Sequence, residues 1–217
     1  MIIDHTDPKY ILRRDAIGKH RYNGAYYYSK EIVKNIIPAV DTDRNWITVR
    51  VPGVGYDHSI VFVHDNVDFE RTYDYMREYD DVIYVVSLPD MIERAEKFGK
   101  TILLPMSVDT KYVKSFKTKK DRDTAFAGRD EWRGGLTLPE GTDLVEMIPR
   151  EEFLSRMARY KNVYAVCRVA IEAKVLGCKV LPFHPRFPDP GIFKILDNAD
   201  AAKILQKQLN EIDGKTK

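Results

Sequence analysis

Residues 162–183, NVYAVCRVAIEAKVLGCKVLPF, decide the fold of this chain. The run opens with the short β-rich segment VYAV and closes with a second one, KVLPF. Between them the apolar side chains recur at the i, i+4, i+7 spacing of one helical face, at Val169, Ala173 and Leu176. Gly177 then ends the helix, because glycine adopts a left-handed conformation without strain. A strand–helix–strand unit of this size is typical of a parallel sheet with the helix packed on its face.

Two charged residues in this unit suggest a binding site. Arg168 lies in the first helical turn, where the helix dipole makes a cation mildly unfavourable. The free N–H groups at that end form an anion site, and the guanidinium would reinforce it for a phosphate. Glu172, four residues later on the same face, could accept hydrogen bonds from a ribose diol. A surface ion pair between these two residues, contributing only a few tenths of a kcal/mol, explains the pattern equally well.

Composition and charge describe a folded protein. The 217 residues are 44% hydrophobic and 31% charged, which suits one domain or two small lobes. A net charge of +2 does not by itself indicate a nucleic-acid binder. No apolar run is long enough to predict a membrane-spanning helix, and the first residues lack the apolar core of a signal peptide. With two cysteines and no paired metal-ligand spacing among the histidines, we expect a cytoplasmic protein without disulfides or a metal site.

Residues 1–106 are expected to form a small N-terminal lobe. Four β-branched runs alternate there with helical patterns, as in a parallel sheet. The expected strands are 46–51, 60–64, 81–86 and 101–104, and the expected helices are 30–37, capped by Ser29, then 68–79 and 90–98. His64 and Asp65 come at the end of the second run, at the edge where parallel sheets bind ligands.

Residues 107–122, which are basic and weakly patterned, are expected to be a hinge before a second lobe of residues 123–217. The expected strands of that lobe are 123–127, 143–148, 163–166, 179–183 and 192–196, and its helices are 150–160, 168–176 and a last one ending at 212. This last helix is expected to pack toward the first lobe. The predicted fold class is therefore α/β, with two Rossmann-like lobes built on parallel sheets.

Several short motifs follow one another in an order that can be compared with known protein families. The strand DVIYVVS leads to PMSVD, a later strand ends in Gly128-Arg129, and the helix quoted above carries EAKVLG. This order resembles that of the two-lobed (GT-B type) glycosyltransferases that use nucleotide sugars, and the second half is similar to the C-terminal lobe of their family 4 (group 1). The resemblance covers roughly residues 81–209 and implies the GT-B arrangement of two Rossmann-like lobes.

The resemblance also implies roles for the positions that match. Gly128 and Arg129 would contact the diphosphate of the donor, with Arg168 beside them and Arg133 as the next cation along the chain. Glu172 would hold hydroxyl groups of the ribose or the sugar. These assignments are what the resemblance implies about the donor site.

On the first lobe, the resemblance implies that His64 or Asp65 would face the acceptor or the transferred sugar. If the sugar's configuration is inverted, one of these residues would be the base that deprotonates the acceptor hydroxyl. If it is retained, no strong base is required. The sequence leaves both outcomes open.

Two departures from the family's pattern keep other functions open. The family carries a Lys shortly after its Gly-Arg, where this chain has Asp130 and Glu131, and Ala165 stands in the position of a family Glu. We expect a metal-independent glycosyltransferase that moves a sugar from a nucleotide-diphosphate sugar to a hydroxyl acceptor, with no separate cofactor. The alternatives are a non-catalytic nucleotide-sugar-binding protein of the same fold, and a transferase that glycosylates modified nucleic-acid bases through the basic stretches 13–21 and 111–122.

Overall fold

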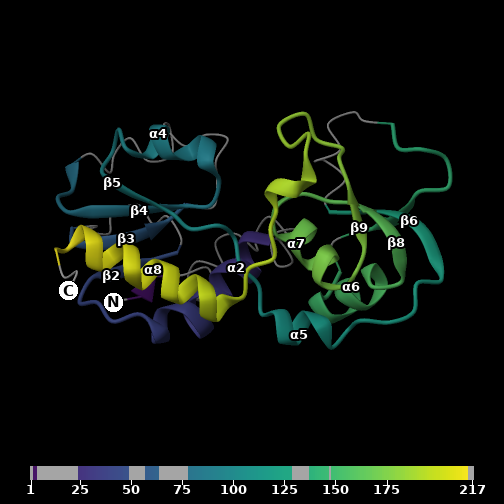
Figure 1. Ribbon diagram of the computed structural model, residues 1–217, viewed down its shortest axis with the longest axis horizontal. Coiled ribbons are helices and arrows are strands. Elements are labelled where there is room, and N and C mark those ends of the chain that lie inside the picture. The colour runs from purple at the N-terminus through teal and green to yellow at the C-terminus, as the bar shows by residue number, and fades with distance from the viewer. Residues whose placement is uncertain are drawn as a thin grey trace, which may run out of the picture. The chain divides into compact units, whose positions relative to one another are not determined.

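A computed structural model shows the fold of the chain, and it describes residues 2–3, 24–48, 57–63, 78–128, 137–146 and 148–214. Two compact units make up the molecule (Figure 1). The first contains Met1–Gly18, Ala25–Pro105 and Asn198–Lys217, and the second contains Lys19–Gly24 and Met106–Asp197. Each unit is built on one parallel sheet, which confirms the predicted α/β class with parallel sheets.

The first unit has five parallel strands that follow one another across the sheet in chain order. They are β1 (Ile2–Ile3), β2 (Asn45–Ile47), β3 (Ser59–Phe62), β4 (Val82–Val86) and β5 (Lys100–Leu103). Every residue of β3 and β4 is buried, as continuous apolar runs in a parallel sheet require. Four of the strands lie at the predicted runs, and β1 was not predicted because two residues carry no periodicity.

The first helix of this unit begins earlier than the sequence predicts. It consists of α2 (Gly24–Glu31), a π-helical stretch η1 (Ile32–Ile36) and a 3-10 turn η2 (Ile37–Ala39). Ser29, expected to cap the helix, lies inside α2, where its buried hydroxyl donates to the carbonyl of Thr48. The helix expected at 68–79 lies outside the described residues. Between β4 and β5 run the short η4 (Pro89–Met91) and α4 (Ile92–Ala95).

The last helix, α8 (Asn198–Ile212), belongs to the first unit although it comes at the end of the chain. It packs against η1 and η2 and is the yellow helix in Figure 1. Its apolar stripe is buried, and polar contacts flank the stripe: the Asn198 amide donates to Glu31, and the Gln206 amide donates to the Asp41 carbonyl. The apolar stripe of this helix therefore packs against other elements of the first unit.

The second unit has a four-stranded parallel sheet in the order β7-β6-β8-β9. Its strands are β6 (Arg122–Ala127), β7 (Asp143–Val145), β8 (Tyr160–Tyr164) and β9 (Lys179–Leu181). Its helices are α5 (Thr110–Lys114), α6 (Arg150–Met157), α7 (Cys167–Val175) and the 3-10 turn η6 (Pro190–Ile192). The strand–helix–strand unit predicted from residues 162–183 is present as β8, α7 and β9. The run at 192–196 forms no strand.

The segment expected to be a hinge contributes to the second unit instead. Asp109 caps α5 by accepting a hydrogen bond from the N–H of Tyr112 at 2.8 Å. Val113 is fully buried, and α5 packs against α7. The basic residues of 111–122 are exposed, except that Lys120 is partly buried and its Nζ donates to the carbonyls of Ala158 and Leu176.

Candidate functional site at the switch point of the second sheet

The order of the strands in the second sheet reverses between β6 and β8. From β6 the chain moves to β7 on one side, and then returns to place β8 on the other side of β6. In open parallel sheets, ligands bind outside the carboxyl ends of the strands at such a reversal, because the two connections leave in opposite directions and open a crevice. This rule points to the residues that follow β6 and β8.

Gly128 follows β6 directly. Its φ angle is +155°, a conformation that residues with side chains rarely adopt, and its N–H donates to the carbonyl of Val145 at the end of β7. A Cβ atom here would lie 3.5 Å from the ring of Phe126. The glycine therefore lets the backbone turn at the end of the strand, where a ligand could approach the chain closely.

The start of α7 lies at the neighbouring strand end. Tyr164 of β8 pairs in register with Phe126 of β6. Val166 and Gly128, which each come two residues later, therefore lie at the same edge of the sheet. Val166 occupies the N-cap position and supplies no side-chain cap to the helix. Cys167, the first helical residue, has a φ of +52°, which is uncommon for a residue other than glycine. Strained backbone of this kind is concentrated at ligand sites.

A buried ion cluster supports this helix. Arg168 donates from Nε to Oε1 of Glu172 at 2.6 Å, and Arg150 donates from Nη1 to Oε2 at 2.6 Å and from Nη2 to Oε1 at 2.5 Å. The Glu172 side chain is 0% exposed, Arg168 is 3% exposed and Arg150 is 12% exposed. The interpretation of Arg168–Glu172 as a surface pair is therefore wrong: the pair forms, but in the interior and with a second arginine.

The charge state of Glu172 follows from these partners. Burial by itself raises the pKa of the carboxyl group, but the charges of Arg150 and Arg168 and their hydrogen bonds outweigh it. The pKa of Glu172 is therefore below its usual value, and the group is ionised at neutral pH. Both carboxylate oxygens accept hydrogen bonds from arginine, so Glu172 holds the two guanidinium groups in place.

Arg150 was not singled out from the sequence. It is the first residue of α6, directly after Pro149, and a cation in the first helical turn is electrostatically unfavourable unless an anion lies nearby. Glu151 and Glu152 in the same turn offset this effect, so the sequence did not mark Arg150 as misplaced. Its partner in the structure is Glu172, 22 positions away along the chain.

The structure brings three of the expected site residues to one part of the second unit. Gly128 ends β6, while Arg168 and Glu172 lie on the helix that follows β8. The other four residues, His64, Asp65, Arg129 and Arg133, lie outside the described residues. Among the described residues, no group of three or more histidine, cysteine or acidic side chains could hold a metal ion.

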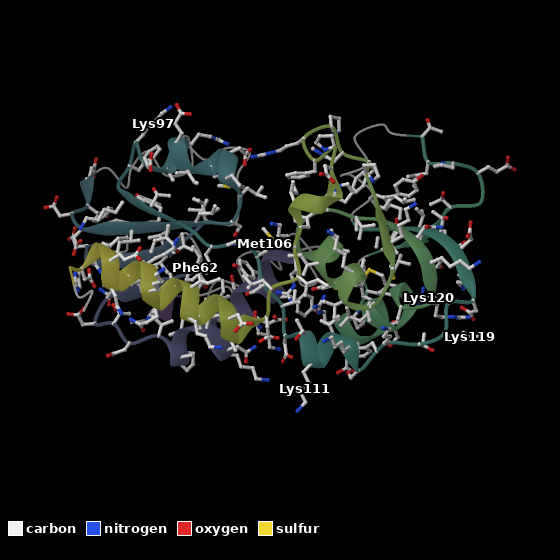
Figure 2. The ribbon with its side chains drawn as sticks, viewed as in Figure 1. Phe62, Lys97, Met106, Lys111, Lys119 and Lys120 are labelled. Carbon is white, nitrogen blue, oxygen red and sulfur yellow. The ribbon has the colours of Figure 1, made fainter. Side chains whose placement is uncertain are left out.

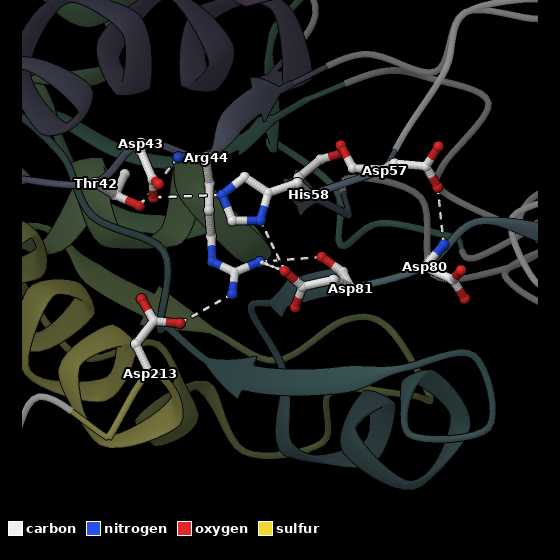
Figure 3. Close-up of polar contacts among 9 residues, drawn as sticks. Thr42, Asp43, Arg44, Asp57, His58, Asp80, Asp81 and Asp213 are labelled. Carbon is white, nitrogen blue, oxygen red and sulfur yellow. Dashed lines mark hydrogen bonds and ion pairs between the residues drawn. The ribbon is translucent and has the colours of Figure 1, made fainter.

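A second polar cluster lies in the first unit (Figure 3). Arg44, whose side chain is 4% exposed, forms ion pairs with Asp81 Oδ2 and Asp213 Oδ1, each at 2.9 Å, and its Nη1 donates to the backbone carbonyl of Asp81 at 3.0 Å. His58 contacts Asp81 through Nδ1 at 2.7 Å and Asp43 through Nε2 at 3.3 Å. The hydrogen bond to Asp81 raises the pKa of His58 above its ordinary value.

This cluster lies at the edge of the first sheet opposite to the edge where parallel sheets generally bind ligands. Arg44, His58 and Asp81 each directly precede a strand, β2, β3 and β4, so they lie at the amino ends of the strands. Asp213 follows α8, and its ion pair with Arg44 fastens the end of that helix to the sheet. We therefore assign the cluster to stability, because ligand sites of parallel sheets lie at the carboxyl ends.

In the part of the chain that the structure describes, no helix is long and apolar enough to cross a membrane. Comparisons with protein-family models, with curated proteins and with solved structures found no match to this chain. The function is therefore argued from the switch point of the second sheet and the residues around it.

Proposed function

We propose that this protein is a nucleotide-sugar-dependent glycosyltransferase whose second unit binds the diphosphate of the donor. The observation that carries the proposal is the start of α7 at the reversal of strand order, with Arg168 in its first turn. A helix N-terminus at a switch point presents N–H groups and a positive dipole end to an anion. Gly128 on the neighbouring strand end allows close approach of the backbone.

The chemistry required of this site is stabilisation of a leaving group. When a glycosyl bond to a nucleoside diphosphate breaks, negative charge accumulates on the departing diphosphate. Oriented N–H groups and arginines stabilise that charge without a metal ion, because they are already held in position before the reaction. Glu172 supports this step by fixing the guanidinium groups of Arg168 and Arg150, and Arg129 and Arg133 are the further cations proposed to reach the donor.

A non-catalytic nucleotide-sugar-binding protein is the second candidate. It is favoured by Ala165, which occupies the position where the resembling glycosyltransferases carry a Glu. Ala165 is 2% exposed and lies between β8 and α7, so this position offers the sugar no polar side chain. In this alternative the protein binds the nucleotide sugar but does not transfer the sugar to an acceptor.

A donor screen tests the proposal. A panel of nucleoside-diphosphate sugars would be examined by thermal shift and calorimetry, with sugar release measured on the same samples. A donor present at about 100 times its dissociation constant stabilises the folded state by about 2.7 kcal/mol, which is easily detected. Binding with turnover supports the enzyme, and binding without turnover supports the second candidate.

Two arginine variants and one control locate the site. Arg129→Ala should weaken donor binding by about 1.5–3 kcal/mol, because it removes a charge-assisted hydrogen bond to the diphosphate. Arg168→Ala should also weaken donor binding, because it removes a buried cation beneath the start of α7. Arg156→Ala is the matched control, since Arg156 is an exposed arginine of α6 paired with Glu152. Folding of each variant would be checked by circular dichroism. Unchanged donor affinity in both test variants would contradict the assignment of the diphosphate site.

A further inference from the structure

A set of five exposed lysines lies away from the switch point, at the edge where the strands of the second sheet begin. We call it the lysine face, and its members are Lys111, Lys114, Lys117, Lys119 and Lys179. The residues of the second unit include 19 Lys and Arg against 13 Asp and Glu, a formal excess of six positive charges, whereas the first unit has 16 against 20. The modest net charge of the whole chain therefore conceals a strongly basic second unit.

The lysines and the arginines of this edge differ in their partners. Arg122 pairs with Asp143 at 3.0 Å, Arg159 pairs with Asp121, and Arg156 pairs with Glu152. In contrast, none of the five lysines has an ion-pair partner among the residues that the structure describes. The arginines are neutralised within the unit, and the lysines leave their charge on the surface.

Contacts within the second unit connect these lysines. A Cβ atom at Gly177 would lie 3.4 Å from Cε of Lys117. Lys117 therefore lies over the end of α7, next to the start of β9, where Lys179 is the first residue. Lys161 does not belong to this surface, because Lys179 pairs in register with Asn162 and the side chain of the preceding residue points to the other face of the sheet. Lys111 and Lys114 are on α5, which packs against α7. In Figure 2 the Lys111 side chain extends away from the ribbon.

Stabilisation of helix ends explains only part of the lysine face. Cations are common near helix C-termini, where free carbonyls and the dipole attract them. Lys111 and Lys114 lie in the last turn of α5 and have this role there. For α6 and α7 it is Lys120 whose Nζ donates to the helix-end carbonyls of Ala158 and Leu176. Lys117, Lys119 and Lys179 lie outside the helices and are additional to these cations.

We infer that the lysine face binds the phosphate backbone of a nucleic acid. A contiguous positive surface of unpaired lysines attracts a polyanion and releases its counterions, whereas paired arginines would not. Lysines act as point charges without the planar fork that reads bases, so binding is independent of sequence. The inference does not depend on the glycosyltransferase proposal, since it concerns the opposite edge of the sheet.

The chemistry of the lysine face favours nucleic acid over a membrane surface. Binding to an anionic bilayer combines cations with apolar side chains that insert between the lipids. Among the described residues, the large apolar side chains that are exposed are Leu144, Ile192, Ile195 and Ile204. None of them belongs to α5, to the segment after it or to the start of β9, which carry the lysine face.

The test measures the affinity for a mixed-sequence 30-base-pair DNA duplex by fluorescence anisotropy, at salt concentrations from 50 to 200 mM. Five phosphate contacts predict a slope of log K against log salt of about −4.5 and an affinity loss of about 500-fold over this range. Removing three lysines with Lys117→Gln, Lys119→Gln and Lys179→Gln should change the slope to about −2 and reduce the loss to about 12-fold.

A matched triple variant controls for net charge. Lys34, Lys97 and Lys100 are exposed lysines of the first unit, and their replacement by Gln removes the same three charges. This control should keep the slope of the unchanged protein. Equal slopes in both triple variants, or no duplex binding at 50 mM salt, would overturn the inference. Tighter binding to vesicles containing phosphatidylserine than to the duplex, at equal phosphate concentration, would overturn it in favour of a membrane.

Discussion

Replacement of Glu172 by Gln tests how much the buried ion cluster contributes to the fold. Gln has nearly the same shape and keeps one acceptor, but it carries no charge. Two guanidinium groups, 3% and 12% exposed, would then remain in the interior without their counterion. Breaking a buried ion pair from one side costs about 3–5 kcal/mol, and we expect about 3 kcal/mol because one acceptor is kept. In a chain of this size that loss lowers the melting temperature by about 6–12 °C.

The assay is urea unfolding followed by circular dichroism, in which a lower midpoint with an unchanged slope reports a loss of stability. Glu152→Gln is the control, because Glu152 is an exposed carboxylate of the neighbouring helix and pairs with Arg156 on the surface. It should lose less than about 1 kcal/mol. Replacing Glu172, Arg168 and Arg150 together by Met should restore most of the stability, since an apolar cluster needs no counterion. A loss in Glu172→Gln no greater than in the control would refute this reasoning.

Three further predictions concern other residues. Because the hydrogen bond to Asp81 raises the pKa of His58, this pair stabilises the fold fully below pH 6.5 and loses its contribution as the pH rises through the higher folded-state pKa. Unfolding measured across that range should show a loss of at most about 1 kcal/mol, since the ring is 46% exposed, and His58→Gln should abolish the dependence. Lys120→Met should destabilise the second unit by about 1.5–3 kcal/mol in urea unfolding, because two helix-end carbonyls lose a charged donor, whereas Lys119→Met should have almost no effect. Asp65→Asn should lower turnover by about 10²–10⁴-fold with donor affinity retained if this residue is the acceptor base, and unchanged turnover would exclude that role.

The sequence by itself determined the local elements of this protein. The β-branched runs became β2 to β6, and the i, i+4, i+7 spacing in residues 162–183 became α7, because periodicity reports which side of an element is buried. Arg168 was also identifiable, since a cation in the first turn of a helix conflicts with the dipole whatever the tertiary structure. The alternation of strands and helices was sufficient to predict parallel sheets.

Only the tertiary structure decided which distant residues meet. Arg150 and Glu172 are 22 positions apart, and Arg44 and Asp213 are 169 positions apart, so no local pattern links them. The order β7-β6-β8-β9, and with it the switch point, depends on which side of β6 each strand joins. No local pattern predicts that choice, because both sides of β6 offer the same backbone hydrogen bonds. The last helix was expected to pack toward the first lobe, but the elements that its buried stripe meets, η1 and η2, were decided by the tertiary structure. An apolar stripe shows that a helix must be covered, but the element that covers it is chosen by packing across the whole chain.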